Sequence, residues 1–241
     1  NIPAMDTLGM EPAIRQVLLD SWLGRGGLVI ICGETGQGKS TTCAAMVKER
    51  MVQHGSFCLT VEDPPEMPLH GQHGAGRCLQ TEVQSGNFAA AMRGAMRCYP
   101  SVNGSMLYVG ETRDSETAAE VLRIATNGHL VLTTLHAQDA MSAMKRFISL
   151  AGDKMNTEEA RGILASAFRV LVHQQLTTVK GRPGEHSKKK LNIEFLLSHS
   201  HSSPVAQKIR QSGADGLMND LIMQKNTLTA QGVRGLLSLW K

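Results

Sequence analysis

The chain has 241 residues, of which 41% are hydrophobic, and a net charge of +4; this suits one large domain or two small ones with a packed core. No run of 18 apolar residues occurs, and residues 1–10 lack the blocks of a signal peptide, so we expect neither a membrane-spanning segment nor a secretory leader. The five cysteines stand singly without a C-x-x-C pair, which favours free thiols in a reducing compartment over disulfides or a zinc site.

The first elements lead to a glycine-rich loop. Residues 2–26 read as a linker and a short helix, in which Pro12 suits the first turn. The apolar, β-branched run at residues 28–32 predicts a buried strand, and residues 41–54, which contain no Gly or Pro, predict a helix. Between them, residues 33–40 read Gly-Glu-Thr-Gly-Gln-Gly-Lys-Ser and fit the phosphate-binding pattern G-x-x-x-x-G-K-[ST].

This loop predicts binding of a nucleotide triphosphate with Mg²⁺. Glycines allow several backbone N–H groups to face one anion, and the helix that follows adds its positive end. We expect Lys39 to reach the β- and γ-phosphates and the Ser40 hydroxyl to hold the metal. The residues expected to bind the nucleotide are Gly33, Thr35, Gly36, Gln37, Gly38, Lys39, Ser40 and Thr41. An ordinary glycine turn before a helix is the plainer alternative.

Strands and helices then alternate. We predict strands at residues 57–61, 105–109 and 130–135, and helices at residues 88–97, 115–126 and 139–151. The Gly- and His-rich residues 67–76 read as a loop. This alternation is typical of a parallel sheet covered on both faces, an α/β fold.

The pattern changes after residue 152. One helix is predicted at residues 158–176, then a two-stranded hairpin formed by residues 177–179 and 191–196, then short helices near residues 203–211, 216–224 and 230–239. We therefore divide the chain into a linker with its first helix (1–26), a P-loop core (27–152) and a mostly helical C-terminal subdomain with a small hairpin (153–241).

Acidic and histidine residues follow successive predicted strands. Glu62 and Asp63, then Glu111, then His136 each stand where a strand ends. Ligands of open parallel sheets bind at the carboxyl ends of strands, so these side chains should share a rim with the glycine loop.

Four motifs in order resemble those of the type II/type IV secretion and pilus motor ATPases, most closely the pilus-retraction branch. Residues 33–40 resemble the family's Walker A motif, residues 61–66 (Val-Glu-Asp-Pro-Pro-Glu) its Asp box, residues 109–114 (Val-Gly-Glu-Thr-Arg-Asp) its Walker B motif and residues 128–136 its His box. The resemblance covers nearly the whole chain and implies a RecA-like P-loop NTPase motor domain.

The resemblance implies roles for the acidic and histidine residues. Glu62 would polarise the attacking water as general base, and Glu111 would hold Mg²⁺, although spacing does not settle which glutamate is the base. A capping or ion-paired acid is the alternative for each. His136 would sense the γ-phosphate or contact a neighbouring subunit, whereas His129 either takes part or packs under the sheet.

Several arginines and possible metal ligands each have a functional and a structural interpretation. Arg93 and Arg97, four residues apart on one helix face, match family arginines that stabilise transition-state charge, and an ion-paired surface is the equal alternative. We expect Arg113 to form a structural ion pair near Asp114. The chain departs from the family at Thr81, where an arginine is usual, and at residues 98–104. The trio His70, His73 and Cys78 favours a surface loop over a metal site, and the basic residues 180–190 favour a solvated hairpin tip.

The resemblance implies an ATP-hydrolysing ring motor of a type IV pilus or a type IV/II secretion system, using ATP and Mg²⁺. It implies a homo-oligomer, expected to be a hexamer, with a preceding N-terminal domain, acting on an inner-membrane platform or channel protein from the cytoplasmic side. The alternatives are a nucleic-acid translocase or conjugative-transfer ATPase on the same fold, and a non-catalytic scaffold. Only nine aromatic residues occur and the basic residues are scattered, so no direct nucleic-acid partner is expected.

Overall fold

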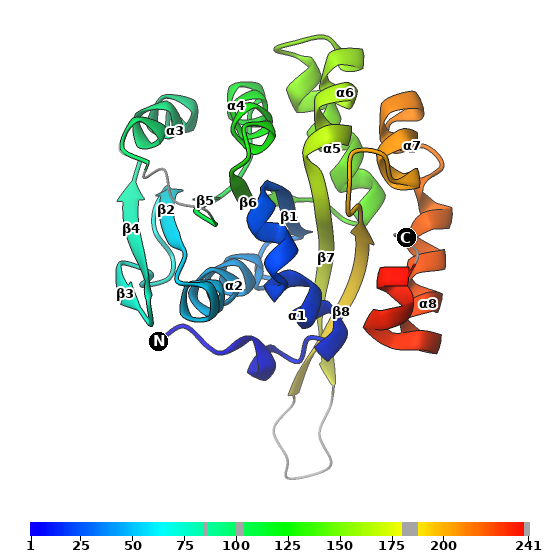
Figure 1. The fold of residues 1–241 in the computed structure, drawn as a ribbon, viewed down its shortest axis with the longest axis horizontal. Helices are drawn as coiled ribbons and strands as arrows, with labels where there is room; N and C mark the ends of the chain where they lie inside the picture. Colours follow the sequence, from blue (N-terminus) through cyan, green and yellow to red (C-terminus); the bar gives the residue numbers. More distant parts are fainter. Residues whose placement is uncertain (84–85, 100–103, 180–187, 239–241) are drawn as a thin grey trace.

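The computed structural model describes residues 1–83, 86–99, 104–179 and 188–238, and these residues build one eight-stranded sheet (Figure 1). The strands are β1 (Gly27–Gly33), β2 (Phe57–Glu62), β3 (Gly71–His73), β4 (Gly76–Glu82), β5 (Met106–Val109), β6 (Leu130–His136), β7 (Phe168–Val179) and β8 (Lys188–Leu197). Their spatial order is β3-β4-β2-β5-β6-β1-β7-β8. The six central strands run parallel, and β3 and β8 pair antiparallel at the two edges.

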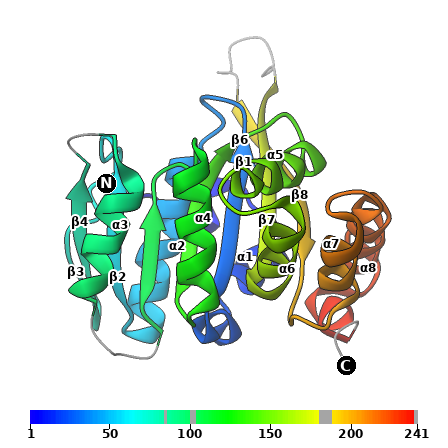
Figure 2. The same cartoon turned by 90° about the horizontal axis from the view of Figure 1, so that it is seen from above.

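Helices cover both faces of the sheet, as the alternating sequence pattern predicts (Figure 2). They are α1 (Pro12–Leu19), α2 (Lys39–His54), α3 (Phe88–Arg97), α4 (Ser115–Thr126), α5 (Ala140–Gly152), α6 (Thr157–Ala167), α7 (Pro204–Ser212) and α8 (Leu217–Ser238), with short 3-10 turns at Met5–Leu8 and Ser21–Arg25. Helices α1 and α2 pack on one face, and α3 to α6 pack on the other. None of the helices in the described part of the chain combines the length and the apolarity that crossing a bilayer requires.

Strand β1 lies in the interior of the sheet. It lies between β6 and β7, and all seven of its residues are buried. Alternate side chains enter opposite cores: Leu28 and Ile30 pack toward α4 and α5, whereas Val29 and Ile31 pack toward α1 and α2. An uninterrupted apolar run is what a strand buried on both faces requires, and it leads directly into the glycine loop.

Aspartates begin the helices that follow the site strands. The Asp114 carboxylate accepts the Thr117 N–H at 2.9 Å at the start of α4, and the Asp139 carboxylate accepts the Ser142 N–H at 2.7 Å at the start of α5. Each cap satisfies an N–H that has no partner within its helix. The caps set where the loops after β5 and β6 end.

The single helix predicted at residues 158–176 is wrong. Helix α6 ends at Ala167, and β7 begins at Phe168 and pairs parallel with β1. The apolar residues of this stretch fit helical spacing, but Phe168 to His173 are all buried or nearly so beside the central strand, and that long-range pairing outweighs local periodicity.

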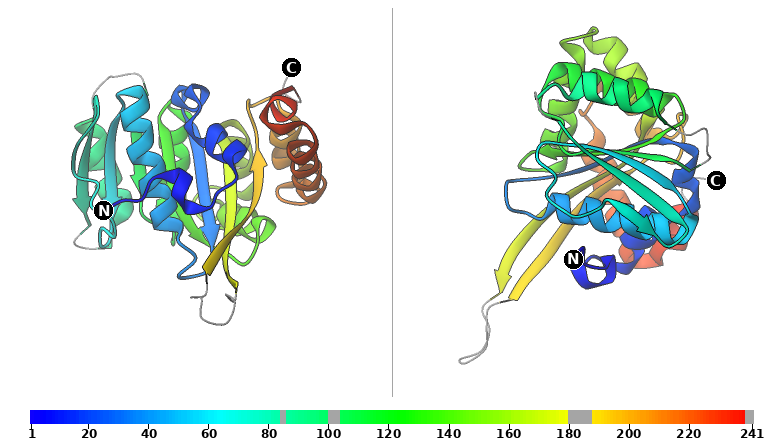
Figure 3. Two further views of the ribbon diagram at one scale, coloured as in Figure 1. Left: turned by 90° about the horizontal axis from the view of Figure 1, so that it is seen from below. Right: turned by 90° about the vertical axis from the view of Figure 1, so that its left-hand side faces the viewer.

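The predicted hairpin exists, but it is longer than expected and belongs to the main sheet. Strands β7 and β8 pair from Val170–Leu197 to Val179–Lys188, and Figure 3 shows their far ends projecting beyond the other strands. Residues 180–187, which hold most of the predicted basic tip, lie outside the described residues. The division of the chain near residue 152 stays a prediction.

Two further predictions need correction. The predicted loop at residues 67–76 contains β3, and residues 76–82 form the unpredicted β4 beside β2. Gly76 fits there because a Cβ would lie 2.5 Å from the Ser56 carbonyl oxygen. The two helices predicted at residues 216–224 and 230–239 fall in α8, which comprises two helical segments separated by a kink at Gly232, where φ is +63°, so the break lies later than predicted.

Candidate active site

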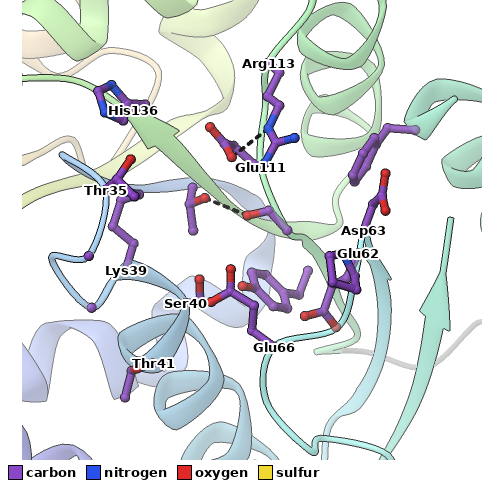
Figure 4. Close-up of a pocket in the computed structure, with 17 residues that line it drawn as sticks. Thr35, Lys39, Ser40, Thr41, Glu62, Asp63, Glu66, Glu111, Arg113 and His136 are labelled. Atoms are coloured by element: carbon purple, nitrogen blue, oxygen red, sulfur yellow. Dashed lines mark hydrogen bonds and ion pairs between the residues drawn. The ribbon is translucent and has the colours of Figure 1, made fainter. Parts of the chain in front are cut away.

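The carboxyl ends of β1, β2, β5 and β6 meet at a cavity of about 420 Å³. Lys39 and Ser40 line it from the glycine loop and the start of α2, and Glu62, Glu111 and His136 line it from the other strand ends (Figure 4). The further lining residues are Thr35, Gly36, Gly38, Thr41, Asp63, Pro64, Glu66, Phe88, Tyr108, Gly110, Arg113 and Thr134. The fold therefore gathers residues from five separate stretches of sequence into one polar cavity.

The glycine loop has the backbone that anion binding needs. Gly36 and Gly38 adopt φ of +76° and +81°, which side-chain-bearing residues rarely adopt. Gly38 directly precedes α2, so the positive end of this 16-residue helix points into the cavity. The Lys39 ammonium donates to the Glu34 carbonyl oxygen at 2.8 Å across the loop. These features fit a phosphate chain.

Strand β7 forms two hydrogen bonds with the glycine loop. The Gln174 side-chain amide donates to the Gln37 carbonyl oxygen at 2.6 Å, and the Gln37 side-chain oxygen accepts the Leu176 N–H at 2.6 Å. The Gln37 side chain therefore faces β7, and its backbone N–H donates to the Glu34 carbonyl oxygen at 3.4 Å. Gln37 does not line the cavity, so its contact with the nucleotide stays a prediction. Sequence reasoning missed Gln174 because it placed residues 158–176 in a helix. We call this pair of contacts the glutamine clasp.

Glu62 is a buried carboxyl at the end of β2. Only 3% of the residue is exposed, and burial raises the pKa of its carboxyl above the usual value. The Gln80 side-chain amide donates to one of its oxygens at 2.8 Å. A raised pKa with a fixed orientation suits a group that accepts a proton near neutral pH.

Glu111 lies in the loop after β5. The Arg113 guanidinium donates to its carboxylate at 2.8 Å, so Arg113 pairs with Glu111 instead of Asp114, which caps α4. Carboxylates and the Ser40 hydroxyl, which line the same cavity, are the hard oxygen ligands that Mg²⁺ prefers. This donor set fits the predicted metal.

The two histidines of the predicted His box lie near opposite ends of β6. His136 lines the cavity, and the strand that carries it is joined to the Glu111 loop because the Thr134 hydroxyl donates to the Gly110 carbonyl oxygen at 2.6 Å. His129 instead packs against the Tyr99 ring, with centroids 4.7 Å apart, and burial lowers the pKa of His129. The packing alternative describes His129 better.

The two predicted arginines do not line this cavity. Both lie on α3, and the Arg93 guanidinium is 3.9 Å from the Glu120 carboxylate, beside a separate groove between α3, α4 and α6. Arg97 lies in the last turn of the same helix. Arg93 thus forms the ion-paired surface weighed above, and a catalytic role for either arginine stays a prediction.

The histidine and cysteine trio is spread along the chain: His70 precedes β3, His73 ends it and Cys78 lies in β4. The His73 ring nitrogen Nε2 lies 2.8 Å from the Leu69 carbonyl oxygen, and Cys78 is fully buried in β4. Across the described ranges, no three His, Cys, Asp or Glu side chains are grouped to hold a metal ion.

Comparison with known proteins gives the same family as the motifs. A sequence model described as "Type II/IV secretion system protein" matches residues 1–231. The chain is 34% identical over 217 residues to the type IV pilus ATPase PilU of Pseudomonas aeruginosa, covering 88% of this chain and 51% of that protein. It is 36% identical over 182 residues to the uncharacterized protein YggR of Escherichia coli K12, covering 74% of this chain and 52% of that protein.

A solved structure resembles the whole fold. The pilus retraction motor PilT with bound ADP superposes with a TM-score of 0.73 and 28% identity, covering 99% of this chain and 62% of that one. The chain thus spans about half the length of PilU and YggR. Its fold is the RecA-like α/β P-loop fold with a mostly helical C-terminal part, and the chain belongs to the type II/IV secretion system protein family.

Proposed function

We propose that the cavity hydrolyses ATP. The observation that carries this proposal is the convergence of Lys39, Glu62 and Glu111 on one hollow at the start of α2. The ADP bound to the PilT relative supports it. A scaffold that only bound nucleotide would not need a buried carboxyl with a raised pKa beside the phosphate loop.

Binding would use the loop and the metal ligands. The N–H groups of the glycine loop and the start of α2 surround the phosphates, and Lys39 exchanges its contact with the Glu34 carbonyl oxygen for the β- and γ-phosphates. Ser40 and Glu111 would hold Mg²⁺, which neutralises charge on the phosphate oxygens.

Hydrolysis would use Glu62 as general base. The oxygen of a water attacks the γ-phosphorus, the bond to the β–γ bridging oxygen breaks, and ADP and phosphate leave. The proton of the water passes to Glu62. Between the two glutamates we assign the base to Glu62, because its burial raises its pKa, whereas Glu111 already pairs with Arg113.

We further propose that the chain works in a ring, expected to be a hexamer, on the cytoplasmic side of the inner membrane. There it would drive pilus retraction or the movement of a pilin or secreted substrate through a platform or channel protein. Arg93 and Arg97 lie away from the cavity of their own protomer, so they reach a phosphate only if a neighbouring protomer presents its α3. We expect no stimulation by DNA, and a large stimulation would favour the translocase alternative.

Two variants test the chemistry. We expect Lys39→Ala to abolish ATP binding in calorimetry, and Glu62→Gln to bind ATP normally while turnover falls by about a hundredfold or more. Lys48→Ala is the matched control. Lys48 lies further along α2, where its ammonium donates to the Ile2 carbonyl oxygen and does not line the cavity. Unchanged ATP affinity in Lys39→Ala would refute the phosphate-loop assignment, and wild-type turnover in Glu62→Gln would refute the assignment of the base.

A further inference from the structure

Gln80 makes four hydrogen bonds with a single side chain. It lies on β4 beside Thr60 of β2, two residues before Glu62. Its amide nitrogen donates to the Glu62 carboxylate at 2.8 Å and to the Met67 carbonyl oxygen at 2.7 Å. Its amide oxygen accepts the N–H groups of Leu69 and His70 at 3.1 and 3.3 Å.

These bonds fix the direction of the amide. Both hydrogens of the Gln80 nitrogen are used, and the oxygen accepts two donors, so the amide cannot turn over without losing all four bonds. Three of the four join it to the segment after the Glu62 strand, which leaves one N–H aimed at the carboxylate. Hydrogen bonds to a charged acceptor are stronger than neutral ones.

Thr60 and the Glu66 backbone also influence the Glu62 carboxyl, because both lower its pKa against the effect of burial. Both come from the chain segment that carries Glu62 itself. Gln80 reaches the carboxylate from the neighbouring strand β4 and also contacts the segment at residues 67–70, so it connects the carboxylate to both.

We propose that Gln80 is a positioning residue for the hydrolytic step, holding the Glu62 carboxylate in the orientation in which it accepts the proton of the attacking water. This rests on the proposed function of Glu62 as general base. Gln80 itself does not line the cavity, so its proposed effect on hydrolysis passes through Glu62.

Replacing the amide tests this role. Gln80→Met keeps the length of the side chain and removes all four bonds, so we expect kcat to fall about tenfold while the Kd for ATP changes less than twofold. Gln80→Glu keeps an oxygen for Leu69 and His70 but has no N–H for Glu62, so we expect a loss at least as large. Gln72→Met is the matched control, because Gln72 lies on the neighbouring β3 and its side-chain amide donates to the Gly74 carbonyl oxygen instead of to Glu62.

A double-mutant cycle separates positioning from a merely structural role. In the Glu62→Gln background, Gln80→Met should cost no further activity, because no carboxylate remains to be oriented. Melting temperatures show whether each variant folds. If Gln80→Met does not fold, the same cycle is measured with Gln80→Glu.

The outcomes are distinct. The same tenfold loss in both backgrounds, wild-type kcat in Gln80→Glu, or a raised Kd with unchanged kcat would overturn the role of Gln80. Wild-type turnover in Glu62→Gln alone would instead overturn the proposed base, whatever Gln80 does.

Discussion

Breaking the glutamine clasp should weaken nucleotide binding without unfolding the protein. Gln174→Leu removes the donor to the Gln37 carbonyl oxygen, a 2.6 Å bond between β7 and the phosphate loop. Gln174 is 1% exposed, and a leucine fits nearly the same volume. The contact of the Gln37 side chain with Leu176 remains in this variant.

The magnitude follows from two opposing effects. Loss of one hydrogen bond costs about 1 kcal/mol. Within the described residues the Gln174 side-chain oxygen is buried without a partner, and its removal returns a similar amount. Global stability should therefore change by less than about 1 kcal/mol. The loop loses about 1 kcal/mol of bias toward its binding conformation, which corresponds to an ATP affinity about fivefold lower.

Calorimetry with ATP and urea unfolding would measure the two quantities on the same protein. Gln175→Leu is the matched control, because the adjacent Gln175 is exposed. We expect wild-type affinity in the control and wild-type kcat in Gln174→Leu at saturating ATP. An affinity loss that appears only together with a large loss of stability would show that Gln174 serves the core and not the loop, and unchanged affinity would refute the clasp.

Two further predictions concern stability and pH. The pKa of Glu62 is raised in the folded protein, so the wild type loses stability as the pH rises from the unfolded-state pKa through the folded-state pKa. Glu62→Gln should therefore melt at a higher temperature than the wild type above this pH window, and this difference should disappear below it. A difference in melting temperature that does not vary with pH would contradict the effect of burial. Asp139→Ala removes the cap of α5 and should cost about 1 kcal/mol in urea unfolding. Because hydrogen bonds from Ser142 lower the pKa of Asp139, the cost should be full above the unfolded-state pKa and disappear as the pH falls through the folded-state pKa; a cost that persists in acid would count against the cap.

The phosphate-loop half of the fold could be predicted from the sequence, because its elements are marked locally. The apolar run before Gly33 fits only a buried strand. The ends of the neighbouring elements are marked by glycines, by an asparagine cap or by a proline. Strand β7 has no such marker. Its apolar residues follow α6 without a Gly or Pro, and only pairing with β1 decides that Phe168 begins a strand.

The sequence predicts where the acidic residues and the histidine of the cavity lie, but it does not predict the glutamines that contact the loop and the Glu62 carboxylate. Glu62, Glu111 and His136 each follow a strand, so sheet topology alone places them on one rim. Gln80 and Gln174 act through contacts between strands that are distant in sequence, one on a strand that was not predicted and one inside a supposed helix. No spacing rule identifies a glutamine whose partner is set by tertiary structure.

Because β1 lies between β6 and β7, the proposed reacting groups and the glutamine clasp lie on opposite sides of the strand that leads into the loop. The reacting groups come from β2, β5 and β6, on one side of β1, whereas the clasp comes from β7 on the other. Substitutions in β7 therefore alter the support of the loop, whereas substitutions at the ends of β2, β5 and β6 alter the groups proposed for hydrolysis. This arrangement would allow the affinity for the nucleotide and the rate of hydrolysis to change independently.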